Sequence, residues 1–147
     1  SGVDGVFFKV LTNRGGSFGK LQAIASGGEM SRFLLALKVC LTDQEQGITM
    51  IFDEIDRGIG GATADSVGRR LSMLAVHGQI IVVTHSPQVA AHGAYQWKVE
   101  KFQSKDNPPI TRIKKLTSRD RLKEIARMLA GKEISNEALA AAKKLLG

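Results

Sequence analysis

The sequence predicts an α/β fold with a mainly parallel sheet, flanking helices and an N-terminal β-hairpin. Residues 48–53 and 79–84 are short apolar runs that end in polar residues, as fully buried parallel strands do. Residues 62–76, between them, repeat apolar side chains at helical spacing. A strand, a helix and a second strand in this order predict a right-handed βαβ unit.

The start of the chain predicts the antiparallel hairpin. Residues 3–11 and 18–24 read as extended segments, and residues 12–16 between them supply turn chemistry. Residues 15–21 (GGSFGKL) lack the glycine spacing and the Ser/Thr of a phosphate-binding P-loop, and no helix pattern follows them. We therefore expect no P-loop in this chain.

A glycine-rich turn then leads into an apolar helix expected to run to about residue 42. Ser26 and Glu29 have the capping-box spacing, so their side chains can satisfy the first backbone N–H groups of the helix. Gly27 and Gly28 allow an anion to approach the positive end of the helix dipole. Paired glycines also begin many ordinary helices, so the turn alone leaves both a phosphate site and a plain helix start open.

The rest of the chain alternates between short strands and capped helices. Pro87 suits the first turn of a short helix that ends near Ala91. Residues 95–102 and 110–116 predict two strands. Thr117 and Ser135 are expected to cap two final helices, the first of which ends at Gly131.

Candidate chemical residues follow the two apolar runs. Asp53 and Glu54 come at the end of the first run, and His85 follows the second. Open α/β sheets bind ligands at the carboxyl ends of their parallel strands. An Asp-Glu pair can also begin a solvated loop, and a histidine before Pro87 can be structural, but their joint occurrence favours a site.

Three motifs in order resemble the signature motif, the Walker B strand and the switch histidine of an ABC-type ATPase head. More closely, residues 24–32 (IASGGEMSR), 52–56 (FDEID) and 84–91 (THSPQVAA) resemble the C-terminal part of the RecN family of bacterial DNA repair proteins, relatives of the SMC proteins. The similarity extends over most of the chain and is densest from residue 24 to residue 91.

This resemblance implies a role for each motif. Asp53 is expected to hold Mg²⁺ through water, Glu54 to orient or deprotonate the attacking water, and His85 to hydrogen-bond the γ-phosphate of ATP. Asp56 matches the D-loop aspartate, which crosses between two heads and contacts the nucleotide. The signature residues are expected to complete the ATP site of a second head; they are Ser26, Gly27, Gly28 and Glu29. Arg57 and Gly60 stand where Thr and Ser are more common, which leaves the finer D-loop contacts open.

The resemblance also implies a function for residues 1–147 as one C-terminal lobe of an SMC-type ATPase head. ATP, with Mg²⁺, would drive head dimerisation during DNA double-strand break repair and recombination, and hydrolysis would release the dimer. The expected partners are the N-terminal Walker A lobe of the same protein, a second copy of the head and DNA, in the bacterial cytoplasm at the nucleoid. This chain alone is expected to be inactive. A fragment of a transporter ATPase and a non-catalytic basic DNA-binding module are the alternatives.

Length and composition agree with one soluble domain. The 147 residues are 43% hydrophobic and 24% charged, and no apolar stretch has the length of a membrane span. Cys40 is the single cysteine, so no disulfide can form within the chain, and a buried free thiol in a reducing cytoplasm is expected. The chain starts with Ser1, which predicts a piece of a longer protein.

The net charge of +7 comes from the last third of the chain. Residues 1–97 hold eight basic and eight acidic residues, whereas residues 98–147 hold thirteen basic and six acidic ones. Such an excess can bind nucleic acid or can simply be a solvated surface. The candidate phosphate contacts are Lys114, Lys115, Arg119, Arg121 and Lys123.

Overall fold

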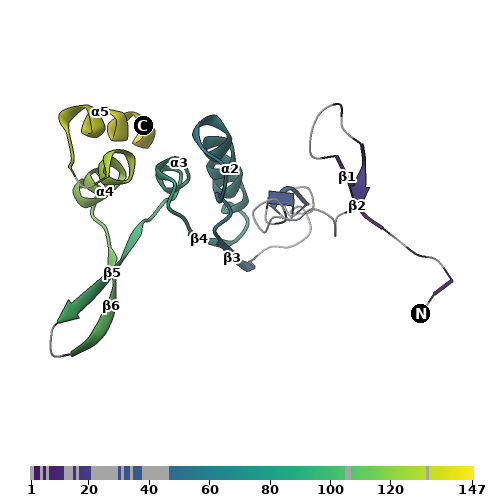
Figure 1. Ribbon diagram of the computed structural model, residues 1–147, viewed down its shortest axis with the longest axis horizontal. Helices are drawn as coiled ribbons and strands as arrows, with labels where there is room; N and C mark the ends of the chain where they lie inside the picture. Colours follow the sequence, from purple (N-terminus) through teal and green to yellow (C-terminus); the bar gives the residue numbers. More distant parts are fainter. Residues whose placement is uncertain are drawn as a thin grey trace.

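A computed structural model describes residues 2–3, 5, 7–11, 15, 17–20, 30, 32–33, 35–37, 47–104, 107–131 and 133–147. The described chain contains both strands and helices, with a strand–helix–strand–helix order from β3 to α3, which confirms the predicted α/β class (Figure 1). The elements in chain order are β1 (Lys9–Val10), β2 (Gly19–Lys20), β3 (Thr49–Asp53), α2 (Gly61–Leu74), β4 (Gln79–Val83), α3 (Pro87–Ala91), β5 (Trp97–Ser104), β6 (Asn107–Lys115), α4 (Ser118–Ala130) and α5 (Asn136–Leu146).

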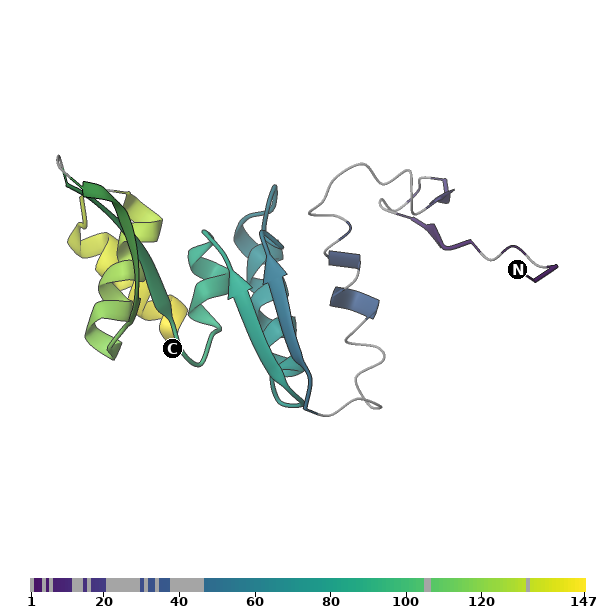
Figure 2. The same cartoon turned by 90° about the horizontal axis from the view of Figure 1, so that it is seen from below.

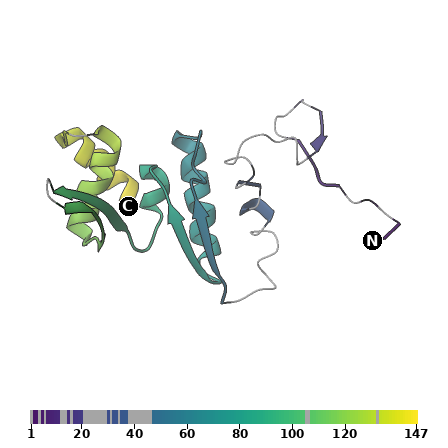
Figure 3. The same cartoon turned by 60° about the horizontal axis from the view of Figure 1, so that its bottom comes forward.

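The predicted βαβ unit is present as β3, α2 and β4. The two strands are direct neighbours and pair in parallel, from Thr49 opposite Gln79 to Asp53 opposite Val83 (Figure 3). Gly78 precedes β4 at a point of close backbone approach, because a Cβ atom there would clash with the carbonyl oxygen of Ile48. The described strands form three separate two-stranded sheets, of which β3–β4 is parallel and β1–β2 and β5–β6 are antiparallel.

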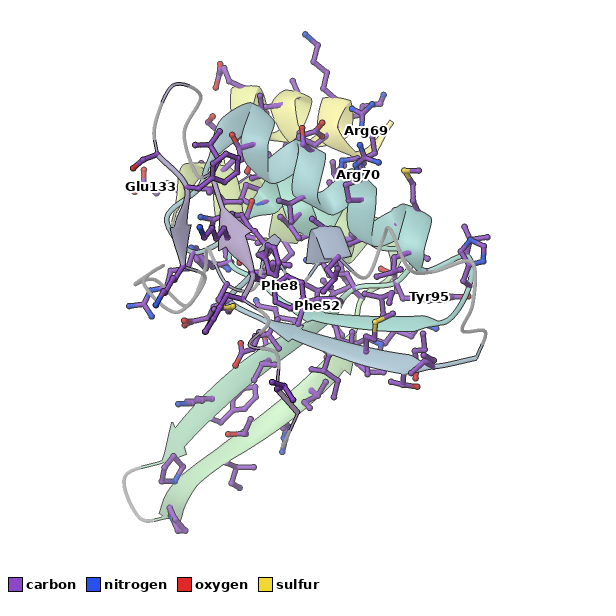
Figure 4. The ribbon with its side chains drawn as sticks, turned by 90° about the vertical axis from the view of Figure 1, so that its right-hand side faces the viewer. Phe8, Phe52, Arg69, Arg70, Tyr95 and Glu133 are labelled. Atoms are coloured by element: carbon purple, nitrogen blue, oxygen red, sulfur yellow. The ribbon has the colours of Figure 1, made fainter. Side chains whose placement is uncertain are left out.

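The main core lies between α2 and one face of this strand pair. Its buried apolar side chains are Leu35, Ile55, Ala64, Val67, Leu71, Leu74 and Val89. Phe52 points from β3 toward α2, and Met50, Ile80 and Val82 pack on the same face (Figure 4).

None of the described elements covers the opposite face of β3 and β4. Ile51 is 69% exposed, and Ile81 and Val83 beside it are also exposed. The expectation of strands buried on both faces is therefore wrong for this chain, because α2 covers one face and no described element covers the other. An apolar surface of this kind is typical of an interface.

In the C-terminal region α4 packs against α5, and both helices contact α3 (Figure 2). Thr117 and Ser135 cap α4 and α5 as predicted, since each hydroxyl accepts a hydrogen bond from the backbone N–H three residues later, at 3.2 Å. A second core joins the helices through Ile125, Ala126, Ala138 and Ala142. None of the described helices combines the length and apolar character needed to span a membrane.

The predicted N-terminal hairpin is present in short form as β1 and β2. Residues 30, 32–33 and 35–37 are helical, in agreement with the helix predicted after the glycine-rich turn, and Leu35 is buried in the main core. The turn itself, Ser26, Gly27, Gly28 and Glu29, lies outside the described residues.

Candidate functional site

The two strands deliver the candidate catalytic side chains to one edge of the parallel pair. Asp53 is the last residue of β3, and its side chain is exposed. The backbone N–H of Glu54 donates to the carbonyl oxygen of Val83 at 3.2 Å, so the pairing continues one residue beyond the strands. The His85 side chain is 76% exposed two residues after β4. The structure therefore brings Asp53, Glu54 and His85 to the same edge of the strand pair, each with an exposed side chain.

Glu54 occupies an unusual backbone conformation. Its φ angle of 50° lies in the left-handed region, and it is the one described residue other than glycine with a positive φ. Such a conformation costs free energy and is concentrated at functional sites. The carboxylate accepts a hydrogen bond from the Arg57 guanidinium at 3.3 Å, but both side chains are largely exposed, so this ion pair contributes little to stability.

Asp56 does not fulfil its predicted role. Its side chain has 0% exposure, so in this structure the carboxylate is not available to a second head or to a nucleotide, and the assignment as a crossing D-loop residue is wrong. Instead, Oδ2 of Asp56 accepts hydrogen bonds from the Thr84 hydroxyl at 2.6 Å and from the backbone N–H of Ser86 at 2.9 Å. These two partners were not singled out from the sequence.

The loop that carries His85 is held tightly despite the exposure of the histidine itself. Ser86 is buried and caps α3, because its hydroxyl accepts from the backbone N–H of Val89 at 3.4 Å. Its backbone N–H also donates to the Thr84 hydroxyl at 3.0 Å. Nδ1 of His85 lies 3.6 Å from Oδ2 of Asp56. The ring therefore projects from a backbone that is fixed on both sides.

The residues at this edge fit a Mg²⁺ site in which the protein supplies only part of the ligands, and water and substrate phosphates supply the rest. Among the described residues there is no cluster of three or more His, Cys, Asp or Glu side chains that could hold a metal ion. Mg²⁺ keeps much of its water and is usually bound by one or two carboxylates together with substrate phosphates. The exposed carboxylate of Asp53 suits such a role. The neighbouring carboxylate of Glu54 would then not be needed to bind the ion.

Two of the five candidate DNA contacts in the last third are engaged within the protein. Nη2 of Arg121 donates to the carbonyl oxygens of Ala90, Ala91 and Gly93 at 3.2, 2.8 and 2.6 Å, and burial lowers the pKa of this guanidinium. Arg121 therefore holds the end of α3 and is only partly exposed, which makes it a poorer phosphate contact than the sequence predicted.

Lys114 is partly committed as well, since Nζ lies 3.4 Å from Oδ2 of Asp120. The other three candidates, Lys115, Arg119 and Lys123, have exposed side chains. Lys115 also lies over the ring of Tyr95, 4.2 Å from its centroid.

Comparisons with known proteins give a consistent set of relatives, although no protein-family model matches the sequence. The chain is 48% identical over 146 residues to the DNA repair protein RecN of Rickettsia felis and 45% identical over 146 residues to that of Haemophilus influenzae. It is 46% identical over 148 residues to RecN of Mycobacterium bovis. Each match covers 99% of this chain, which spans only 25–27% of the length of these relatives.

A solved structure gives independent support for the fold. It comes from work on ATP-driven dimerization and DNA stimulated activation of SMC ATPases, and it superposes with a TM-score of 0.56. The match covers 81% of this chain and 70% of the other chain at 19% sequence identity. At this level of identity the likeness shows a shared fold and no finer detail.

Proposed function

Because this chain is a relative of the RecN DNA repair proteins and corresponds to their C-terminal part, we propose that it is one lobe of an ATPase head. In the complete protein, ATP binding would join two heads and hydrolysis would separate them during repair and recombination of double-strand breaks, in the cytoplasm at the nucleoid. The observation that carries this proposal is the exposure of Asp53, Glu54 and His85 along one edge of a parallel strand pair.

Each of these side chains has a place in phosphoryl transfer, which needs positioning and charge stabilisation more than covalent chemistry. Asp53 would hold Mg²⁺, and the bound ion would neutralise developing charge on the phosphates. Glu54 would orient the attacking water and accept its proton. His85 would donate a hydrogen bond to the γ-phosphate. The turn at residues 26–29 would meet the γ-phosphate bound by the partner head.

The uncovered strand faces support a second lobe of the same protein as the partner of this one. Ile51, Ile81 and Val83 form an exposed apolar face on the central strands, and Val99 and Ile113 form another on the hairpin. Burying such surface contributes about 25 cal/mol per Å². The relatives are roughly four times as long as this chain, so most of the polypeptide that could cover these faces lies elsewhere. We assign this surface to the lobe that carries the Walker A motif.

DNA is a second proposed partner, through the exposed cations of the C-terminal region. Replacing Lys115, Arg119 and Lys123 together by Gln should weaken duplex binding by the complete protein. It should also reduce the salt dependence of binding, because each phosphate contact adds close to one unit to the slope. The matched control replaces three other exposed cations by Gln, namely Arg69 and Arg70 on α2 and Lys101 on β5. An equal loss in both triple variants would remove the assignment to these three side chains.

The decisive experiment separates the metal role from the water role in the complete protein. Glu54→Gln should retain ATP binding and lower the single-turnover hydrolysis rate by about 10²- to 10⁴-fold, because it removes general-base help. The dimer should then accumulate with ATP in size-exclusion chromatography. Asp53→Asn should weaken Mg²⁺-dependent binding itself, and Ser26→Arg should bind ATP without dimerising.

Hydrolysis at the wild-type rate by Glu54→Gln would contradict the assignment of the base. This chain by itself is expected to show no ATPase activity and no tight ATP binding, since no P-loop was found in its sequence. Micromolar affinity for ATP in calorimetry on the chain alone would overturn that expectation.

A further inference from the structure

We infer that Asp56 is a positioning residue, which fixes the switch loop around His85 relative to the turn that carries Glu54. This inference deepens the proposed function and rests on it. Asp56 touches neither nucleotide nor metal in this role, since its side chain is fully buried. It acts through hydrogen bonds to the residues on both sides of His85.

One oxygen atom makes both of these bonds. Oδ2 of Asp56 accepts from the Thr84 hydroxyl at 2.6 Å and from the backbone N–H of Ser86 at 2.9 Å. The contacts cross 28 and 30 residues of sequence. Because the residues before and after His85 are tied to the same atom, the backbone of the histidine has little freedom to move. The ring is largely exposed and has little packing of its own to hold it.

Asp56 itself belongs to the turn after β3, so its two hydrogen bonds connect this turn to the loop that carries His85. Ile55, between Glu54 and Asp56, is fully buried in the main core. The carbonyl oxygen of Asp56 accepts from the backbone N–H of Ile59 at 3.2 Å, and that of Glu54 accepts from Arg57 at 3.0 Å. The turn is thus rigid, and the carboxylate connects it to the loop after β4. The distance between the Glu54 and His85 backbones is set by this connection.

The energetics favour a positional role over a stabilising one. A buried carboxylate is costly unless it is fully hydrogen-bonded. Oδ1 of Asp56 is buried and has no hydrogen-bond partner among the described residues, so its desolvation is only partly offset. An apolar side chain could fill this volume at a lower cost. A costly charge that joins two catalytic loops is the pattern expected of a residue that orients groups which touch the substrate.

The test is a double-mutant cycle in the complete protein, with kcat and KM for Mg-ATP as readouts. Asp56→Asn removes the charge, and Thr84→Val removes the hydroxyl at constant shape. Each should lower kcat by about 10- to 100-fold, as is typical of residues that orient catalytic groups, with KM changed by less than about twofold. Thr84→Ser keeps the hydroxyl and should restore most of the activity. Asp65→Asn, at a carboxylate on α2 that is hydrogen-bonded to Arg69 and His92 and to neither of these loops, is the matched control and should leave kcat unchanged.

The cycle includes His85→Ala, which tests whether Asp56 acts through the histidine. In that background Asp56→Asn should lower kcat by less than about twofold, because the ring that it positions is gone. The same fold-loss in both backgrounds would overturn the inference, as would wild-type kcat for Asp56→Asn. If Asp56→Asn does not fold, Thr84→Val tests the same connection between the two loops, because it removes one of the two hydrogen bonds to Asp56 and keeps the buried charge.

The outcome also distinguishes this inference from the proposed function. If the wild-type protein hydrolyses ATP and loses activity on Glu54→Gln while Asp56→Asn and Thr84→Val stay fully active, the proposed function stands and the positioning role is wrong. If the wild-type protein shows no ATP hydrolysis, the proposed function itself is wrong, and the positioning role is overturned with it.

Discussion

The central region, residues 47–93, and the C-terminal region, residues 95–147, use charged side chains in opposite ways. At the strand edge of the central region, Asp53, Glu54 and His85 are exposed, and the backbone beneath them is held by one buried carboxylate. In the C-terminal region many charged side chains form ion pairs with one another. The sequence concentrates the positive charge in the C-terminal region, but the exposed side chains of the candidate site lie in the central region.

Glu124 of α4 is the centre of the paired charges. Its side chain is only 10% exposed and accepts hydrogen bonds from the Arg127 guanidinium, while Nζ of Lys98 lies 3.1 Å from its carboxylate. Hydrogen bonding to Glu100, and then to Glu124, raises the pKa of Lys98. These contacts connect the hairpin to α4, so the basic residues involved act as structural elements. A count of lysines and arginines therefore overstates the number of unpaired cations on the surface of this region.

The largest stability effect should come from Arg121, which links the two regions. Arg121→Ala removes a donor from three backbone carbonyl oxygens at the end of α3 and should lower the free energy of unfolding by about 2–4 kcal/mol. Arg119→Ala, an exposed neighbour on the same helix, should change it by less than about 0.5 kcal/mol. Urea denaturation measures both. Equal stabilities for the two variants would mean that Arg121 is only a surface cation.

A smaller effect is expected for Glu124→Gln, which leaves Lys98 and Arg127 without their shared carboxylate. The cost should be about 1–3 kcal/mol in urea denaturation, since hydrogen bonds to charged groups are lost in a largely buried place. Glu133→Gln, at an exposed position, is the control. ATP hydrolysis by the complete protein should be unchanged at saturating ATP, in contrast to Glu54→Gln. A loss of hydrolysis without a loss of stability would break the division between the two regions.

Acid should reduce the stability that paired carboxylates contribute in both regions, because protonation removes their negative charge. Burial raises the pKa of Glu124, but hydrogen bonds and charges from Arg127 and Lys98 outweigh this, and the net pKa lies below its ordinary value. A carboxyl group with a depressed folded pKa adds stability above its unfolded pKa and loses it as the pH falls through the folded value. The stability gap between wild type and Glu124→Gln should therefore shrink between pH 5 and pH 3.

The smallest effect belongs to Asp65, which pairs α2 with the loop after α3. Hydrogen bonds from His92, at 2.8 Å, and then from Arg69 lower the pKa of Asp65 below its ordinary value of 3.8. Asp65→Asn should therefore cost more stability at pH 7 than at pH 3, because the contribution of a carboxylate with a lowered folded pKa declines as the pH falls below its unfolded pKa. Thermal unfolding at the two pH values measures the difference. An equal gap at both would show that the carboxylate charge contributes nothing to this contact.

The sequence by itself determined the elements and their order. The βαβ unit, the short helix Pro87–Ala91 and the caps at Thr117 and Ser135 were all predicted correctly, because periodicity and capping depend on residues only a few positions apart. The exposed edge with Asp53, Glu54 and His85 also followed from the rule for parallel strands. Strand limits in the β5–β6 hairpin were displaced by one to three residues, because the pairing register and not local composition sets them.

Only the tertiary structure decided which of these residues are free. Asp56 looked like an exposed loop residue, but its burial depends on Thr84 and Ser86, 28 and 30 residues later in the chain. Arg121 looked like a surface cation, but it is held by carbonyl groups about 30 residues earlier. The apolar run of β3 looked buried on both faces, yet one face is exposed because the element that would cover it is not among the described ones. Exposure depends on contacts between distant segments, and no local pattern in the sequence encodes those contacts.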